Sequence, residues 1–95
     1  MVEVTVRFAS YLQETIGVSE EGWRMPTGSD VYELLDELIT YYGKQLEEII
    51  YDEDGKQRPT LRIILNGWDI RFLSDEKLVL GNGDIVLILP GLAGG

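Results

Sequence analysis

The sequence of 95 residues contains neither cysteine nor histidine. Without cysteine there can be no disulfide, no thiolate metal ligand and no cysteine nucleophile. Without histidine the commonest general base and metal ligand is missing as well. The remaining side chains show no pattern typical of an acid–base pair or an activated nucleophile. We therefore expect a protein that is not an enzyme and that binds no metal.

Long apolar runs and basic residues are also scarce. No run approaches membrane-spanning length, and the first residues alternate like a strand instead of forming a signal peptide, so we expect a cytoplasmic protein without membrane contacts. Eight basic residues stand against 17 acidic ones, and a net charge of −9 is repelled by the phosphates of nucleic acid. Most of the acids lie in residues 1–55. This acidic part is either an ordinary solvated surface or a surface that attracts a basic partner.

Three segments have the pattern of strands. Alternation of apolar and polar residues predicts a strand over 2–8, and the segment around Trp23 predicts an antiparallel partner over 18–25. The apolar run 85–89 predicts a buried strand. Pro90 ends this strand because proline has no N–H to donate to a neighbouring strand.

A helix is predicted over 30–42. Asp30 is a favourable N-cap, and Glu33 stands where its side chain can complete a capping box. Apolar residues then recur at i, i+3, i+4, i+7 and i+8, which gives one stripe for burial, and Gly43 suits the position after the helix. A short second helical turn is expected over 44–50.

Polar segments separate the remaining elements. Residues 9–17 are expected to form a loop or a single turn. Residues 51–56 are expected to form a surface loop, because the spacing of their acids does not match a calcium loop. Asn66-Gly67 is a two-residue hairpin signal, which places strands over 61–65 and 70–73 on either side of it.

The predicted order of elements, β-β-α-β-β-β, gives an α+β domain over residues 1–89 and a flexible tail over 90–95. We expect a mixed sheet of four or five strands crossed by one main helix, which is the β-grasp arrangement of ubiquitin. The strands over 2–8 and 85–89 are the most apolar and should be central. The expected core contains Val4, Val6, Leu34, Leu35, Leu38, Ile63, Leu65, Ile85 and Leu87.

Three motifs stand out on this scaffold: Asn66-Gly67, Asn82-Gly83-Asp84 and the ending Leu92-Ala93-Gly94-Gly95. With them the chain resembles, over its full length, the ubiquitin-like sulfur-carrier family. That family includes the small subunit of molybdopterin synthase, the thiamine-biosynthesis sulfur carrier and archaeal small modifier proteins. The length of the chain and its segment 44–60 resemble the molybdopterin type.

Two positions depart from the family's pattern. Members of the molybdopterin type usually carry two prolines before the tail, whereas here Gly91 follows Pro90, which predicts a more flexible tail. An arginine that is common in the loop after the first strand is replaced by Gln13. Both changes bear on which partner the protein binds.

The resemblance implies a chemistry at the carboxylate of Gly95. An adenylating enzyme of the ubiquitin-activating type would use ATP and Mg²⁺ to activate Gly95, and a sulfur-donor protein would convert it to a thiocarboxylate. The large subunit of molybdopterin synthase would then take the sulfur. Leu92, Ala93 and Gly94 would thread the partner's channel, and the chain itself would bind no cofactor tightly.

Two aromatic residues near the second hairpin have no assigned place. Trp68 and Phe72 are either docking residues for such partners or ordinary core residues.

Other functions share the same ending. An archaeal modifier that is conjugated to lysines through Gly95 begins from the same adenylate, and so does a sulfur carrier of the thiamine pathway. A plain interaction module whose Gly-Gly ending is a frayed terminus is a further alternative.

Overall fold

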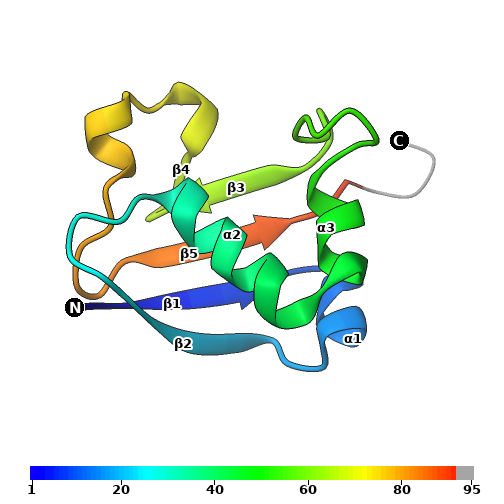
Figure 1. Ribbon diagram of the computed structural model, residues 1–95, viewed down its shortest axis with the longest axis horizontal. Helices are drawn as coiled ribbons and strands as arrows, with labels where there is room; N and C mark the ends of the chain where they lie inside the picture. Colours follow the sequence, from blue (N-terminus) through cyan, green and yellow to red (C-terminus); the bar gives the residue numbers. More distant parts are fainter. Residues whose placement is uncertain (92–95) are drawn as a thin grey trace.

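The computed structural model describes residues 1–91, whose five strands form one sheet in the order β2-β1-β5-β3-β4 (Figure 1). Helices and 3-10 turns lie between the strands. In chain order the elements are β1 (Val2–Phe8), α1 (Leu12–Ile16), β2 (Glu20–Met25), α2 (Val31–Tyr42), α3 (Lys44–Ile50), β3 (Arg62–Leu65), β4 (Trp68–Asp69), η1 (Ile70–Phe72), η2 (Asp75–Leu78) and β5 (Ile85–Leu89).

The sheet is mixed, as predicted. β1 and β5 lie side by side and parallel inside it, with Val6 opposite Val86 and Phe8 opposite Ile88. β2 is antiparallel to β1, and β3 is antiparallel to both β5 and β4. Neighbouring parallel strands require a long crossover, and here the chain between β1 and β5 supplies the helices that cover the sheet. The predicted central position of strands 2–8 and 85–89 is confirmed.

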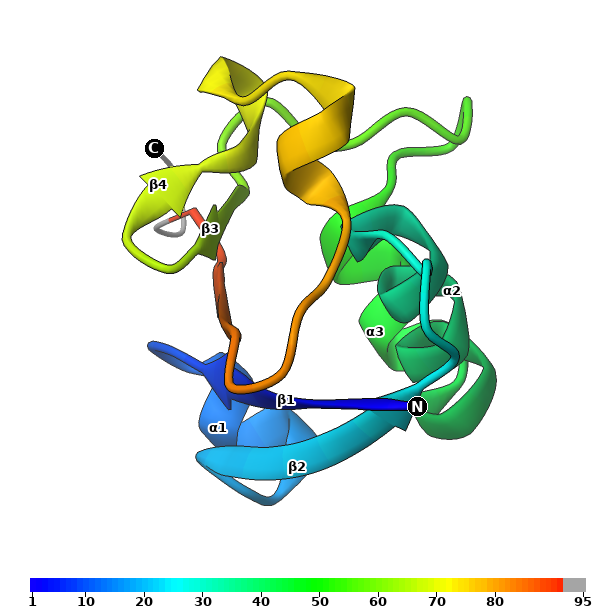
Figure 2. The same ribbon diagram turned by 90° about the vertical axis from the view of Figure 1, so that its left-hand side faces the viewer.

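Helix α2 crosses one face of the sheet, and α3 follows on the same side (Figures 1 and 2). The predicted capping box is present. The side chain of Asp30 accepts from the N–H of Glu33 at 2.9 Å, and Glu33 Oε1 accepts from the N–H of Asp30 at 3.4 Å. The apolar stripe is buried against the sheet and contains Val31, Leu34, Leu35 and Leu38. Each such leucine contributes about 1.5–3 kcal/mol through burial.

One core prediction is wrong, because β5 turns its other face inward. Ile85 and Leu87 are half-buried, and Val86 and Ile88 are buried in their place. Five consecutive apolar residues carry no period-two signal. The inward face is set by pairing, since Val86 lies opposite the buried Val6 and directly opposite residues share a face. The other expected core residues are buried, namely Val4, Val6, Leu34, Leu35, Leu38, Ile63 and Leu65.

The predicted strand over 70–73 is also wrong. Beyond the Asn66-Gly67 turn, pairing is limited to the two residues of β4, and the chain then enters the 3-10 turn η1. Asp69 explains the change, because its Oδ1 accepts from the N–H of Arg71 at 2.9 Å and this local bond favours a turn over an extended backbone. The turn directs Ile70 into the core.

The sequence predicted no element where the 3-10 helix η2 lies, and the other elements differ from expectation mainly in their bounds. Residues 9–17 contain the single short helix α1, whose Leu12 is buried, and α3 covers the predicted 44–50. The strands expected over 18–25 and 61–65 begin at residues 20 and 62. Within residues 1–91, no helix is both long enough and apolar enough to span a bilayer.

Candidate functional site

The tail begins at the end of β5, next to β3. Leu89 lies opposite Arg62, Pro90 is buried, and Gly91 lies against Thr60. Leu92, Ala93, Gly94 and Gly95 lie outside the residues that the structure describes, so their roles in threading and activation stay predictions. The boundary between the domain 1–89 and the tail 90–95 stays a prediction as well, although Pro90 and Gly91 both contact the domain.

The motif Asn66-Gly67 binds the start of β5 through side-chain hydrogen bonds. The side chain of Asn66 donates to Asp84 Oδ1 at 2.9 Å and accepts from the N–H of Ile85 at 2.8 Å. Asn66 has φ +50° and Gly67 has φ +89°, left-handed values that asparagine and glycine adopt more readily than other residues. The hairpin turn therefore does more than reverse the chain, because it holds β5 in register with β3.

The motif Asn82-Gly83-Asp84 ties the same end of β5 to β1. Asn82 Oδ1 accepts from the N–H of Glu3 at 2.8 Å, and the carbonyl of Asp84 accepts from the N–H of Thr5 at 2.9 Å. Asp84 Oδ2 also accepts from the N–H of Gly81 at 2.7 Å. Both motifs thus position the strand from which the tail leaves, and neither supplies a reactive group.

The face of the sheet opposite the helices carries an apolar strip that sequence reasoning missed. Ile64, Ile85 and Leu87 lie half-buried on this face, and with Arg7 they line a shallow hollow of about 290 Å³. Leu87 sits between Arg7 on β1 and Ile64 on β3. The alternation of apolar and polar residues in β1 identifies its outward residues. In β5 all residues are apolar, so its outward residues can be recognised only from its pairing with β1. We call this surface, Arg7, Ile64, Ile85 and Leu87, the open-face strip.

Trp68 and Phe72 are surface residues, which decides against the core alternative. Their side chains are 65% and 81% exposed. They line one hollow of about 350 Å³ together with Leu73 and Lys77. Because Trp68 lies opposite Leu65, and Leu65 opposite Val86, this hollow is near the start of β5, whereas the tail leaves from its end. A docking role for Trp68 and Phe72 stays a prediction.

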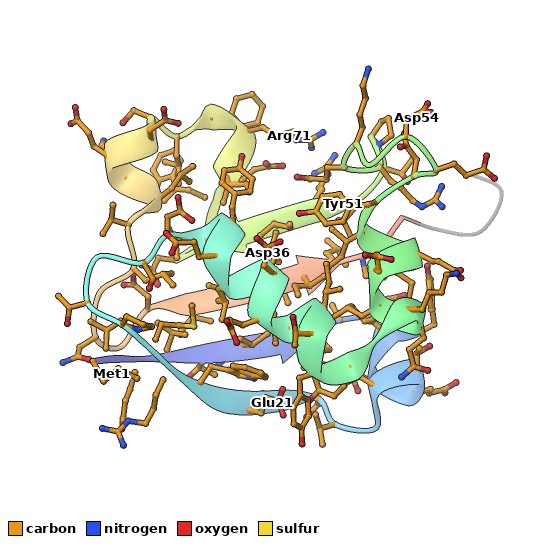
Figure 3. All side chains as sticks on the ribbon, in the orientation of Figure 1. Met1, Glu21, Asp36, Tyr51, Asp54 and Arg71 are labelled. Carbon is orange, nitrogen blue, oxygen red and sulfur yellow. The ribbon has the colours of Figure 1, made fainter. Side chains whose placement is uncertain are left out.

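The largest pKa shift belongs to an aromatic cluster under the end of α2. Burial raises the pKa of the Tyr42 hydroxyl, and its hydrogen bond to Glu21 raises it further. Glu21, labelled in Figure 3, also accepts from the indole N–H of Trp23 at 2.7 Å. The ring of Tyr42 packs edge-on against Phe8 and Tyr41. We interpret this cluster as a structural contact that joins β2 to α2, because its polar groups form hydrogen bonds with one another.

The acidic loop after α3 is organised by its own hydrogen bonds. Asp52 Oδ1 accepts from the N–H groups of Asp54 and Lys56 at 2.9 and 3.0 Å. This side chain therefore stabilises the turn. Among the residues that the structure describes, no three Asp, Glu, His or Cys side chains are grouped so as to hold a metal ion.

The helices carry mostly acidic charge, whereas the opposite face of the sheet carries charges of both signs. Residues 31–50, which form α2 and α3, contain a single base, Lys44. Their exposed acids are Glu33, Asp36, Glu37, Glu47 and Glu48. On the opposite face, exposed arginines flank the apolar residues, with Arg7 opposite Leu87 and Arg62 opposite Leu89. Arg7 also forms an ion pair with Glu20 on β2, with 3.4 Å between Nε and Oε1, so the open face carries both signs of charge whereas the helix face is mainly acidic.

This arrangement defines a ubiquitin-like β-grasp protein whose last strand leads directly into the Gly-Gly ending. The chain belongs to the ThiS family, whose sequence profile matches residues 6–95. The expected relationship to ubiquitin-like sulfur carriers and small archaeal modifier proteins is confirmed. Sulfur carriers of this family are carrier proteins without catalytic activity, and the family implies a partner of the ubiquitin-activating type.

Two known proteins are similar to this chain in sequence. Small archaeal modifier protein 3 of Haloferax volcanii is 29% identical over 94 residues, covering 99% of this chain and all of the relative. A putative sulfur carrier protein of Archaeoglobus fulgidus is 35% identical over 65 residues, covering 68% of this chain and 73% of the relative.

Two solved structures are also similar to this chain. The small archaeal modifier protein 1 of Methanosarcina acetivorans is 31% identical, with a TM-score of 0.77 over all of this chain and 98% of the other. A putative molybdopterin converting factor, subunit 1, from Pyrococcus furiosus is 27% identical, with a TM-score of 0.73 over 97% of this chain and all of the other.

Proposed function

We propose that this protein carries sulfur as a thiocarboxylate on Gly95 and delivers it in the synthesis of molybdopterin, the pterin of molybdenum and tungsten cofactors. The observation that carries the proposal is the full-length similarity to the putative molybdopterin converting factor subunit of Pyrococcus furiosus. The segment formed by α3 and residues 51–60 supports it, because the thiamine-type carriers typically lack such a segment. In this role the protein binds the large subunit of a molybdopterin synthase.

The chemistry requires activation, because a terminal carboxyl group with a pKa of about 3.5 is ionised at neutral pH and resists nucleophilic attack. In the activating enzyme, which supplies ATP and Mg²⁺, a carboxylate oxygen of Gly95 attacks the α-phosphorus of ATP and pyrophosphate leaves. Sulfur that a donor protein supplies as hydrosulfide then attacks the carbonyl carbon of the Gly95 adenylate, and AMP leaves. The product is a thiocarboxylate, formed without any base, metal or thiol of the carrier.

The docking surface in this proposal is the open-face strip. Its apolar residues are only half-buried, and arginine flanks them on the adjoining strand, a combination that suits an interface with an apolar centre and a charged rim. β5 connects this strip to the root of the tail, so that a partner seated on the strip has the tail within reach. Trp68 and Phe72 offer a second contact area at the other end of β5.

Mass spectrometry tests the proposed activation. Incubation of the full chain with the activating enzyme of the same organism, ATP and Mg²⁺ should add one AMP, and a sulfur donor should then exchange one oxygen for sulfur. Deletion of Gly95 should abolish both products while the thermal unfolding curve stays that of the wild type. The absence of an adenylate with every activating enzyme of that organism would contradict the proposal.

The second candidate is a protein modifier, favoured by the full-length similarity to small archaeal modifier protein 3. A modifier forms the same adenylate but joins Gly95 to lysine side chains of target proteins. The two functions separate at the acceptor. Consumption of the thiocarboxylate by a pterin synthase supports the carrier, whereas Gly-Gly remnants on lysines in digests of cell extracts support the modifier.

A further inference from the structure

Gly91 passes unusually close to Thr60. A Cβ placed on Gly91 would lie 2.5 Å from the Cβ and 2.6 Å from the Oγ1 of Thr60, and 3.3 Å from its carbonyl oxygen. At every other glycine within residues 1–91, an added Cβ would meet no atom nearer than 3.8 Å. Glycine at 91 is therefore required by a close approach, whereas the turn glycines of this chain serve their backbone angles.

Thr60 belongs to a wall that is held in place. The neighbouring Pro59 offers its carbonyl to Arg71, whose Nη1 donates to it at 3.2 Å. Arg71 is itself fixed by Asp69, with distances of 3.2 Å from Nε to Oδ1 and 2.9 Å from Nη2 to Oδ2. On the other side, Leu61 is buried. Figure 3 shows Arg71 directed toward the segment that carries Asp54.

The contact between Gly91 and Thr60 limits how far the carboxylate of Gly95 can lie from the domain. Where the chain leaves the sheet, Pro90 is buried and Gly91 lies against Thr60, so two consecutive residues at this point are in contact with the domain. Four residues, 92–95, follow Gly91, and four residues span at most about 14 Å when fully extended. The Cα atom of Gly95 can therefore lie at most about 14 Å from the Cα atom of Gly91, so an enzyme that acts on Gly95 must bring its reactive centre close to this part of the domain.

We propose that Gly91 and Thr60 are positioning residues for activation, a steric stop that sets where and in which direction the tail leaves the domain. This inference rests on the proposed function of Gly95. A proline at position 91 would also carry a Cβ and would collide with Thr60 in the same way, so this close approach requires glycine instead of the second proline that is usual in the molybdopterin type. It also places the wall of residues 59–61 at the mouth of the partner's tail-binding channel.

The test is a set of matched variants assayed for adenylate formation. Gly91→Ala should lower kcat/KM by about tenfold or more, because small misplacements of a reacting group are expensive in rate. Adding Thr60→Gly should restore most of the activity, since it removes the Cβ that the new methyl group meets at 2.5 Å. Adding Thr60→Ala should not, because alanine keeps that Cβ. Gly22→Ala is the control, as a Cβ there meets open space.

A second readout separates failure of this inference from failure of the proposed function. In NMR spectra, Gly91→Ala should shift the amide signals of Thr60 and Leu61 and leave those of α2 unchanged. If the wild type forms an adenylate and Gly91→Ala forms it equally well, or if Thr60→Gly does not rescue, the positioning role is wrong. If the wild type forms no adenylate, the proposed function fails and the positioning role fails with it.

Discussion

At the scale of single residues, the side chains that resemble functional groups serve mainly to hold the backbone. Asn66 and Asp84 join two turns, Asp69 fixes Arg71, and Glu21 joins Trp23 to Tyr42. The side chain of Arg71 holds the pKa of the Asp69 carboxyl below its usual range through hydrogen bonds and charge. These polar groups have partners within the domain and hold its turns and strand ends in place.

Asn66→Ala should destabilise the fold by about 1–3 kcal/mol, because it removes two hydrogen bonds and places alanine, which adopts a left-handed backbone less readily than asparagine, at φ +50°. Asn66→Gly keeps the backbone angle without the hydrogen bonds and should recover part of that loss. Urea unfolding measures both changes. If Asn66→Ala is as stable as the wild type, the two turns are not coupled through this side chain.

Tyr42 should make the fold sensitive to alkaline pH. Its folded pKa lies above the unfolded value of about 10, so its contribution to stability is complete below about pH 10 and is lost as the pH rises toward the folded pKa. Tyr42→Phe should therefore show a smaller loss of unfolding free energy between about pH 9 and 11 than the wild type. Tyr41→Phe, at an exposed ring, is the control and should follow the wild type.

At the scale of elements, α2 and β5 illustrate two ways in which an apolar face is chosen. α2 has a stripe of period 3.6 and a capping box, so its inward face follows from its own residues. β5 is apolar on both faces, and its inward face follows from its register with β1. The face that β5 leaves outside forms the open-face strip.

Leu38→Ala should lower the free energy of unfolding by about 2–5 kcal/mol, because Leu38 is fully buried between α2 and the sheet and the smaller side chain leaves a cavity. Glu37→Ala, at the next and exposed position of the same helix, should change stability by less than about 0.5 kcal/mol. Urea unfolding at neutral pH compares the two variants. Equal effects would mean that α2 does not provide the core contacts described above.

At the scale of the whole molecule, the two faces of the sheet differ in charge and in polarity. The charged side chains of α2 and α3 are almost all acidic, whereas the open-face strip consists of apolar residues and Arg7, which pairs with Glu20. A partner that must also take the tail has its apolar contacts available on the strip. Association at such a surface depends on a few apolar side chains near its centre.

Leu87→Asp should weaken binding to the activating enzyme by about tenfold or more, because it places a charge at the centre of the open-face strip. Tyr32→Asp is the control. It places the same charge at an exposed residue of α2, on the opposite side of the sheet, and should change binding little. Titration calorimetry gives the affinities, and thermal unfolding shows whether each variant is folded. Equal affinities of the folded variants would remove the strip from the interface.

The sequence predicted those parts of the protein whose signals are local. The alternation in residues 2–8, the helix from its Asp30 cap and the Asn66-Gly67 turn depend on neighbours along the chain, and each was predicted correctly. The family resemblance was visible in short motifs for the same reason, although two of those motifs position β5 and take no part in the chemistry.

Tertiary structure decided what depends on residues far apart in the sequence. The inward face of β5 depends on pairing between residues eighty positions apart, and the glycine at 91 depends on Thr60, which lies thirty-one positions earlier. The exposure of Trp68 and Phe72 depends on the early end of β4, where a single carboxylate turns the chain. Periodicity in a sequence records only nearby positions, so packing between distant segments determines which apolar residues are buried and which are left exposed on the surface.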